Sequence, residues 1–158
     1  MTSIDYETIF SSFLGSITDY DFAHLSMSES FSLMTEYLHT ALAESYLRRV
    51  FSSISLDDDA QTLSYELKYV VDEIGDNDFI ISLIAKWMVY EWLHKEVRSK
   101  NLTSQFFGTK EQKFFSQSNH LTEMRALLDD VYKEARFMLQ DRGYINNSYI
   151  GGASNGQA

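Results

Sequence analysis

The stretch DFIISLIAKWMVYEWLHKEV, residues 78–97, decides the fold of this chain. Its apolar residues cover most of the circumference of a helix, and a helix of that kind packs on several sides. Asp76 and Asn77, just before the stretch, are both good residues for a helix start. We therefore expect a central helix in which Trp87 and Trp92 lie on different edges and anchor neighbouring helices by packing.

Two amphipathic helices are expected to accompany the central one. Upstream, Ser26 and Glu29 have the spacing of a capping box, and the helix that they begin is expected to reach the pair Arg48 and Arg49. Downstream, apolar residues recur in alternating steps of three and four along one narrow seam that stops at Gly143. The seam consists of Leu121, Met124, Leu128, Val131, Ala135 and Met138.

Residues 50–71 break this helical rhythm. FSSIS at 51–55 is β-prone, apolar residues alternate with others along 63–71, and the acidic run 57–59 between them suits a turn. These features predict a short β-hairpin. The alternative is a helix capped by Asp59, and periodicity alone does not exclude it. Its apolar stripe would consist of Leu63, Leu67, Val70, Val71 and Ile74.

Shorter elements complete the expected architecture. Near the amino terminus, Thr2 or Ser3 can cap a short helix that Gly15 ends. NLTSQFFGTKEQKFFSQSN, residues 101–119, is expected to be a connection whose two Phe pairs either fold back on the core or form an edge for a neighbouring subunit. Those pairs are Phe106 with Phe107 and Phe114 with Phe115. The fold class is thus mainly α, a small bundle of three to four helices with a hairpin insertion and an extended tail.

Composition limits the kind of protein this is. A chain of 158 residues with 44% hydrophobic residues predicts one folded domain. No stretch reaches the roughly 20 apolar residues that span a bilayer, and the first residues do not resemble a secretory signal. The absence of cysteine excludes disulfides and thiolate chemistry. We expect no membrane partner.

Charge is divided unevenly along the chain. Residues 1–80 hold 15 acids and 3 bases, a formal charge of −12, whereas residues 81–158 hold 8 acids and 10 bases, or +2. Nucleic-acid binders depend on clustered Lys and Arg, so direct DNA binding is disfavoured. The acidic half either keeps the protein in solution as a solvated surface or associates head to tail with the less acidic face of another copy.

The motif E-x-x-H is the strongest hint of chemistry, and it occurs as Glu36 with His39 and as Glu91 with His94. In ferritin-like proteins, two such motifs and two further Glu hold a pair of metals on facing helices. Here only Glu91 lies in the apolar arc of its helix, and only three long helices are expected. No phosphate loop, dinucleotide fingerprint or nucleophile elbow is present. We assign no catalytic residue, no cofactor and no metal.

The last residues, YINNSYIGGASNGQA at 144–158, are set apart from the domain at 1–143. Asn, Ser and Gly dominate them and favour no regular structure, but two aromatic–aliphatic pairs stand among them, Tyr144 with Ile145 and Tyr149 with Ile150. Such a segment is most useful when another chain supplies its binding surface. We expect it to be an extended docking tail.

Several stretches between about residues 45 and 150 resemble small structural proteins of tailed bacteriophages, the head–tail connector or neck adaptor proteins. These stretches are RRVFSSISLDDDAQTLSYELK, DEIGDNDFIISLIAKWMVYEWL, FFGTKEQKFFSQSNHLTEMRALL and ARFMLQDRGYINNSYI. The resemblance implies a mostly helical subunit that forms a dodecameric ring beneath the portal and extends a terminal segment toward it. It also implies that DNA passes through the ring without specific binding.

The expected function is therefore assembly in the virion neck, after synthesis in the host cytoplasm. Partners would be other copies of the chain, the portal and the next neck or tail-completion protein. Tyr144, Ile145, Tyr149 and Ile150 would dock, while Arg48 and Arg49 would pair with acidic residues of a neighbour. Two alternatives remain open, a small acidic phage protein that binds a host protein and, disfavoured by the helix geometry, a carboxylate metal enzyme.

Overall fold

The computed structural model describes residues 1–17, 22, 25–106 and 111–144, with the backbone alone at 100–106, 111–119 and 144. These residues form five helices and one three-stranded antiparallel sheet, so the predicted fold class, mainly helical with a short hairpin, is confirmed. In chain order the elements are β1 (Thr2–Asp5), α1 (Tyr6–Gly15), α2 (Met27–Ala43), α3 (Ser45–Arg48), β2 (Phe51–Asp57), β3 (Thr62–Leu67), α4 (Glu73–Phe106) and α5 (Glu111–Tyr144).

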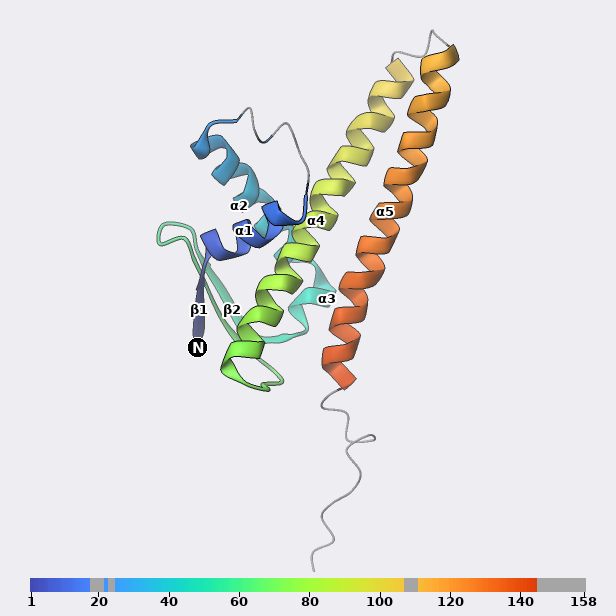
Figure 1. Cartoon of the computed structure of the whole chain (residues 1–158). Coiled ribbons are helices and arrows are strands. Elements are labelled where there is room, and N and C mark those ends of the chain that lie inside the picture. Colours follow the sequence, from blue (N-terminus) through green and yellow to red (C-terminus); the bar gives the residue numbers. More distant parts are fainter. Residues whose placement is uncertain (18–21, 23–24, 107–110, 145–158) are drawn as a thin grey trace, which may run out of the picture.

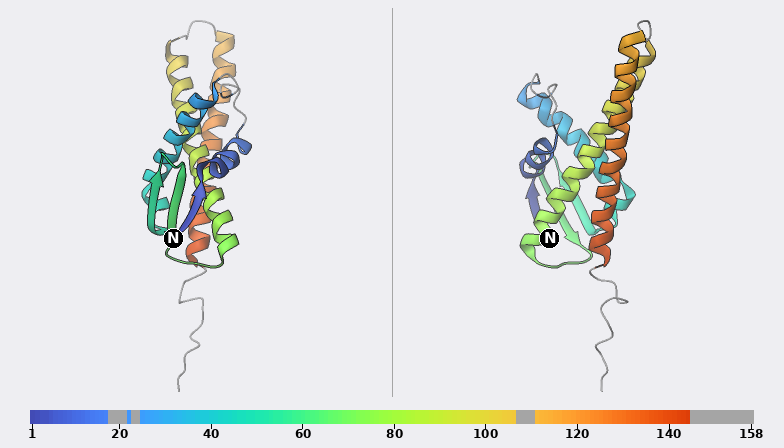
Figure 2. Two further views of the ribbon diagram at one scale, coloured as in Figure 1. Left: turned by 90° about the vertical axis from the view of Figure 1, so that its left-hand side faces the viewer. Right: turned by 45° about the vertical axis from the view of Figure 1, so that its right-hand side comes forward.

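Helix α4 is the central element, as its apolar circumference predicts. It packs against α1, α2 and α5, and the last of these lies antiparallel to it (Figure 1). Two further views show α1, α2 and the sheet on one side of α4 and α5 on the other (Figure 2). Five consecutive inward-facing side chains of α4 are fully buried, and Trp92 is partly buried against the same core. The five are Ile80, Leu83, Ile84, Trp87 and Met88.

The start of α4 differs from the expected Asp76 or Asn77. The helix begins at Glu73, because Asp72 provides the cap: its Oδ1 accepts a hydrogen bond from the backbone N–H of Gly75 at 2.7 Å. Asp76 is instead buried inside the first turn, where its carboxylate accepts from the backbone N–H of Val71 at 3.1 Å. Both aspartates thus hold the chain where β3 leads into α4.

Helix α5 carries the predicted seam. Met124, Val131 and Ala135 are buried, and the other three seam residues pack partly buried against the core. The helix ends at Tyr144, one residue past the expected stop. The prediction of a connection over 101–119 was wrong, since α4 continues to Phe106 and α5 begins at Glu111. No proline interrupts this stretch, so helix persists on both sides of Gly108. The Phe pairs fall outside the described side chains.

The prediction that Thr2 or Ser3 caps a helix was wrong. Thr2 and Ser3 do not cap a helix; they lie in strand β1, which pairs antiparallel with β3 and brings Ile4 opposite Leu63. A strand that pairs with residues about 60 positions away has no signature in its own sequence. A helix cap has one, so the local pattern favoured the helix. The helix that follows, α1, ends at Gly15 as predicted.

The hairpin prediction is confirmed, and the helical alternative for 59–74 is contradicted. Strands β2 and β3 pair antiparallel around the acidic turn, which we define as Asp57, Asp58 and Asp59, and the sheet order is β1-β3-β2. Strand β3 ends at Leu67, earlier than the alternation to residue 71 suggests. Asp58 fixes the turn to the body, because its Oδ1 accepts a hydrogen bond from the hydroxyl of Tyr6 at 2.7 Å and lies 3.0 Å from Nε2 of His39.

Helix α2 begins with the predicted capping box, in which the backbone N–H of Glu29 donates to Ser26 Oγ and the backbone N–H of Ser26 donates to the Glu29 carboxylate. It does not run through to Arg48 and Arg49. The helix ends at Ala43, Glu44 is extended, and the short helix α3 follows. Arg48 makes this break possible, because its Nε donates at 2.8 Å to the carbonyl of Leu42, one of the open carbonyls at the end of α2.

Candidate interaction surface

The sequence-predicted partner-binding residues divide into two groups. Ile145, Tyr149 and Ile150 lie outside the described residues, as does the side chain of Tyr144, whose backbone ends α5. Arg48 and Arg49 are adjacent in the sequence but make different contacts. Arg48 is occupied by the end of α2, whereas Arg49, just past the end of α3, lines a pocket against α5. Their pairing with a neighbouring subunit stays a prediction.

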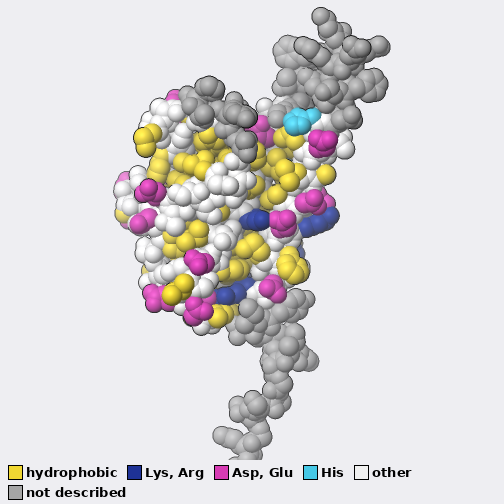
Figure 3. Space-filling view, viewed as in Figure 1, with side chains coloured by type: hydrophobic (Ala, Val, Ile, Leu, Met, Phe, Trp, Pro, Cys, Tyr) yellow, Lys and Arg dark blue, Asp and Glu magenta, His cyan; other side chains and the backbone are white. Residues whose placement is uncertain are grey.

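Beside the end of α5, the segment between β3 and α4, together with the first turn of α4, exposes a cluster of large apolar side chains. We call it the apolar edge; its members Tyr69, Val70, Val71 and Ile74 are 49%, 70%, 53% and 76% exposed. Figure 3 shows hydrophobic side chains among acidic ones at this lower end of the molecule. Apolar side chains gathered in this way, rather than scattered singly, mark surfaces that other molecules cover.

A buried ion pair, which we call the clamp, holds the apolar edge in place. Arg142 in the last turn of α5 pairs with Asp76 in the first turn of α4, and their side chains are only 10% and 7% exposed. Arg142 also donates through Nη2 to the backbone carbonyl of Tyr69 at 3.1 Å and lies 4.9 Å from the ring centre of Phe79. With Asp76 bonded to the N–H of Val71, the clamp fixes both the apolar edge and the end of α5.

Sequence analysis missed the clamp and the apolar edge. The two clamp residues are 66 positions apart, and nothing in the local pattern pairs them. The available signal was a pair of acids, Glu73 and Asp76, in the first turn of one long helix and an arginine in the last turn of another. The strand interpretation places Tyr69 and Val71 on a buried face, and the helical alternative places Val70, Val71 and Ile74 on a buried stripe, so neither predicts an exposed apolar edge.

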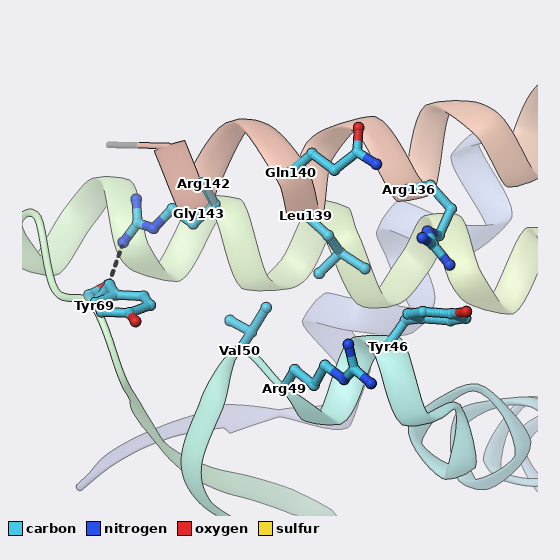
Figure 4. A pocket seen from close by; sticks show the side chains of 9 residues that line it. All are labelled: Tyr46, Arg49, Val50, Tyr69, Arg136, Leu139, Gln140, Arg142 and Gly143. Carbon is cyan, nitrogen blue, oxygen red and sulfur yellow. Dashed lines mark hydrogen bonds between the residues drawn. The ribbon is translucent and has the colours of Figure 1, made fainter. Parts of the chain in front are cut away.

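A pocket with a volume of about 270 Å³ lies between α3 and the carboxyl-terminal part of α5 (Figure 4). Arg136 of α5 points toward Tyr46 of α3, with its guanidinium carbon 3.5 Å from the ring centre, and the guanidinium carbon of Arg49 lies 5.4 Å from the same centre. Val50 and Leu139 contribute apolar wall. Among the described residues, no carboxylate lies within ion-pair distance of Arg49 or Arg136.

The two E-x-x-H motifs do not form a metal centre in the part of the chain that is described. Glu36, Glu91 and His94 line one shallow hollow between α2 and α4, together with the cations of Lys95 and Arg98, while His39 turns away to Asp58. No group of three or more His, Asp or Glu within the described ranges is arranged to hold a metal ion. As expected from the helix geometry, Glu36 is exposed and Glu91 is partly buried.

The surroundings of Glu91 disfavour the ionised form of its carboxyl group. Burial, and then the negative charge of Glu44, raise its pKa, although Arg98 opposes the shift. One turn further along, burial and then Arg98 lower the pKa of His94. Ionised Glu91 therefore costs folding free energy near neutral pH.

We expect Glu91→Gln to raise the melting temperature at pH 7. A carboxyl whose pKa is higher in the folded than in the unfolded state contributes stability at low pH, and loses it as the pH rises through the folded-state pKa. The gain of the variant should therefore shrink toward pH 4, where wild-type Glu91 is largely protonated. Melting curves measured by circular dichroism at both pH values test this, with Glu36→Gln in the same hollow as control. A gain that persists unchanged at pH 4 would contradict the expectation.

Comparison with known proteins gives no relative on which to rest an assignment: no family model, no curated protein and no solved structure matches this chain. In addition, no helix within the described ranges combines the length and the apolarity that crossing a membrane requires.

Proposed function

We propose that this chain is a virion structural protein, a head–tail connector of a tailed bacteriophage that forms a ring under the portal and docks through its carboxyl-terminal segment. Its partners are other copies of itself, the portal and the next neck or tail-completion protein, and DNA passes through the ring. The proposal assigns no catalytic residue. The observation that carries it is the apolar edge, exposed beside the helix end from which residues 145–158 continue.

The apolar edge supports docking because it is both exposed and held rigid. Two of its members, Val70 and Ile74, leave more than two thirds of their surface open to water. The clamp fixes the backbone at Tyr69 and Val71, so little conformational freedom is lost when a partner covers the edge. A preformed apolar surface next to the carboxyl-terminal segment gives a partner two linked contacts, and linkage raises the overall affinity. We take the portal to be the occupant of this surface.

The charge distribution suits a protein that surrounds DNA without binding it. The first 80 residues carry a formal charge of −12. Like charge keeps a phosphate backbone from adhering to a channel wall. An acidic wall therefore lets DNA slide past, and the proposal places part of this half toward the channel.

The double substitution Val70→Asp with Ile74→Asp tests docking. Both side chains are exposed, so we expect the free energy of unfolding to change by no more than about 0.5 kcal/mol per site. Binding to purified portal rings should weaken about 30-fold or more, the loss that follows removal of a contact worth about 2 kcal/mol. Calorimetric titration and incorporation into particles measure the effect. Deletion of residues 145–158 should also abolish docking while leaving a folded subunit.

Matched controls are Met27→Asp and Leu127→Asp, which place the same charge on exposed apolar residues away from the apolar edge. They should dock as the wild type does. If the edge variant and the tail deletion both dock normally, the proposal fails. If the purified protein ignores the portal and instead captures a host protein, the alternative of a small acidic host-directed binder replaces it.

A further inference from the structure

We infer that the pocket between α3 and α5 receives the acidic turn of a second copy of this chain. The inference deepens the proposed function, since it names the contact through which copies assemble. Its two arginines, Arg49 and Arg136, are not members of the apolar edge, although Tyr69 belongs to both surfaces, so self-association and docking can be tested with different substitutions.

The pocket is built to bind carboxylates. Arg49 and Arg136 both face it, and no described carboxylate pairs with either. The Arg136 guanidinium lies over the Tyr46 ring and donates through Nη1 to the Tyr132 hydroxyl at 3.4 Å. These contacts hold the group in place, and a guanidinium has five N–H donors, so others can bind a carboxylate. Hydrogen bonds between arginine and carboxylate are charge-assisted and about twice as strong as neutral ones.

The pocket is small, with a volume of about 270 Å³. One or two short acidic side chains fit such a space. Val50 and Leu139 supply apolar wall beside the charged groups, where the aliphatic residues next to an acidic turn can pack.

The acidic turn presents suitable carboxylates in a fixed arrangement. Asp58 is bonded to Tyr6 and His39, which anchors the turn to the body. Asp57 uses Oδ1 to accept the backbone N–H of Ala60 at 2.9 Å, so its other oxygen is available. Asp59 is exposed, and no partner for it is found among the described residues. Asp57 and Asp59 are therefore the carboxylates that we assign to the pocket of the neighbour.

The positions of turn and pocket require two molecules. In Figure 1 the β2–β3 turn lies on the side of the molecule away from α5, so a copy cannot place its own turn in its own pocket. A contact between two different surfaces is head to tail, and repetition of such a contact closes into a ring when the rotation permits. The formal charges of −12 and +2 on the two halves of the chain favour the same orientation.

The carboxyl-terminal tail is not the occupant on chemical grounds. Residues 145–158 contain neither Asp nor Glu, so they offer no side-chain carboxylate to the two arginines. The densest group of acids in the sequence is the run at 57–59.

Cross-linking provides a direct test, because the chain has no native cysteine. Asp59→Cys is made in one preparation and Gln140→Cys, on the pocket wall, in a second preparation that carries a mass tag. Mixed under mild oxidation, they should give a disulfide-linked heterodimer as the main product. Met27→Cys replaces Asp59→Cys in the control, and it should give little product. Equal yields from Asp59→Cys and Met27→Cys would overturn the inference.

Charge reversal gives an independent measurement. Arg49→Glu with Arg136→Glu should weaken self-association about 30-fold or more in sedimentation experiments, as should Asp57→Lys with Asp59→Lys. A chain with all four substitutions should associate again, since the pairs are restored with opposite sign. Failure of this rescue, with all variants folded, would overturn the inference. So would a wild-type chain that stays monomeric while its pocket binds inorganic phosphate. Neither experiment uses the portal, so a negative result here leaves the docking test intact.

Discussion

Asp76→Ala is expected to lower the free energy of unfolding by about 3–5 kcal/mol, the usual cost of removing one partner of a buried ion pair. The substitution leaves the guanidinium of Arg142, a side chain only 10% exposed, without its counter-charge. It also removes the acceptor of the Val71 N–H. Urea denaturation followed by circular dichroism measures the loss. The apolar edge should become mobile at the same time, which amide exchange at Val71 reports.

A double variant separates the clamp from mere packing. Asp76→Leu with Arg142→Met removes both charges, and it also removes Nε of Arg142, a buried donor with no acceptor among the described residues. It should therefore recover much of the stability lost in Asp76→Ala. The exposed pair of Lys133 and Asp129 is the control, and Asp129→Asn should cost less than about 1 kcal/mol. Equal losses for Asp76→Ala and Asp129→Asn would show that the clamp does not stabilise the fold.

Trp87→Ala should be similarly costly, with a loss of about 3–5 kcal/mol. Trp87 is fully buried where α4 meets α5, and its ring lies edge-on to Tyr90 at 5.7 Å and to Tyr132 at 5.8 Å between ring centres. Alanine leaves a large cavity and removes both aromatic contacts. The expected result is a lower urea midpoint with an unchanged slope, because the same surface is exposed on unfolding.

Trp87→Phe is the informative companion. It keeps an aromatic ring between α4 and α5, and it removes the indole Nε1, for which the described residues provide no acceptor. The cost should therefore be well below that of alanine. If the two variants were equally destabilised, the aromatic contacts with Tyr90 and Tyr132 would contribute nothing.

The parts of the fold that sequence analysis predicted are those with strong local signals. The near-continuous apolar run at 78–97 specifies α4, and the capping box at Ser26 and Glu29 fixes the start of α2. The acidic turn between two β-prone runs specifies the hairpin. Each signal lies within one turn or one element, so neighbouring residues are sufficient to read it.

What could not be predicted depends on contacts between distant residues. Strand β1 exists because β3, about 60 residues away, offers it backbone partners. The residues of the apolar edge have the composition of core residues, and only their position relative to the clamp leaves them exposed. The pocket likewise combines Tyr46 with Arg136, which are ninety positions apart.

The position of the clamp has a mechanical consequence. Residues 145–158 begin only three positions after Arg142, so a pull on this segment reaches the buried ion pair before it reaches the seam of α5. Force then passes through Asp76 into α4, a helix of 34 residues and about 50 Å. The two long helices would then resist the force together along their shared interface, and would not separate one turn at a time.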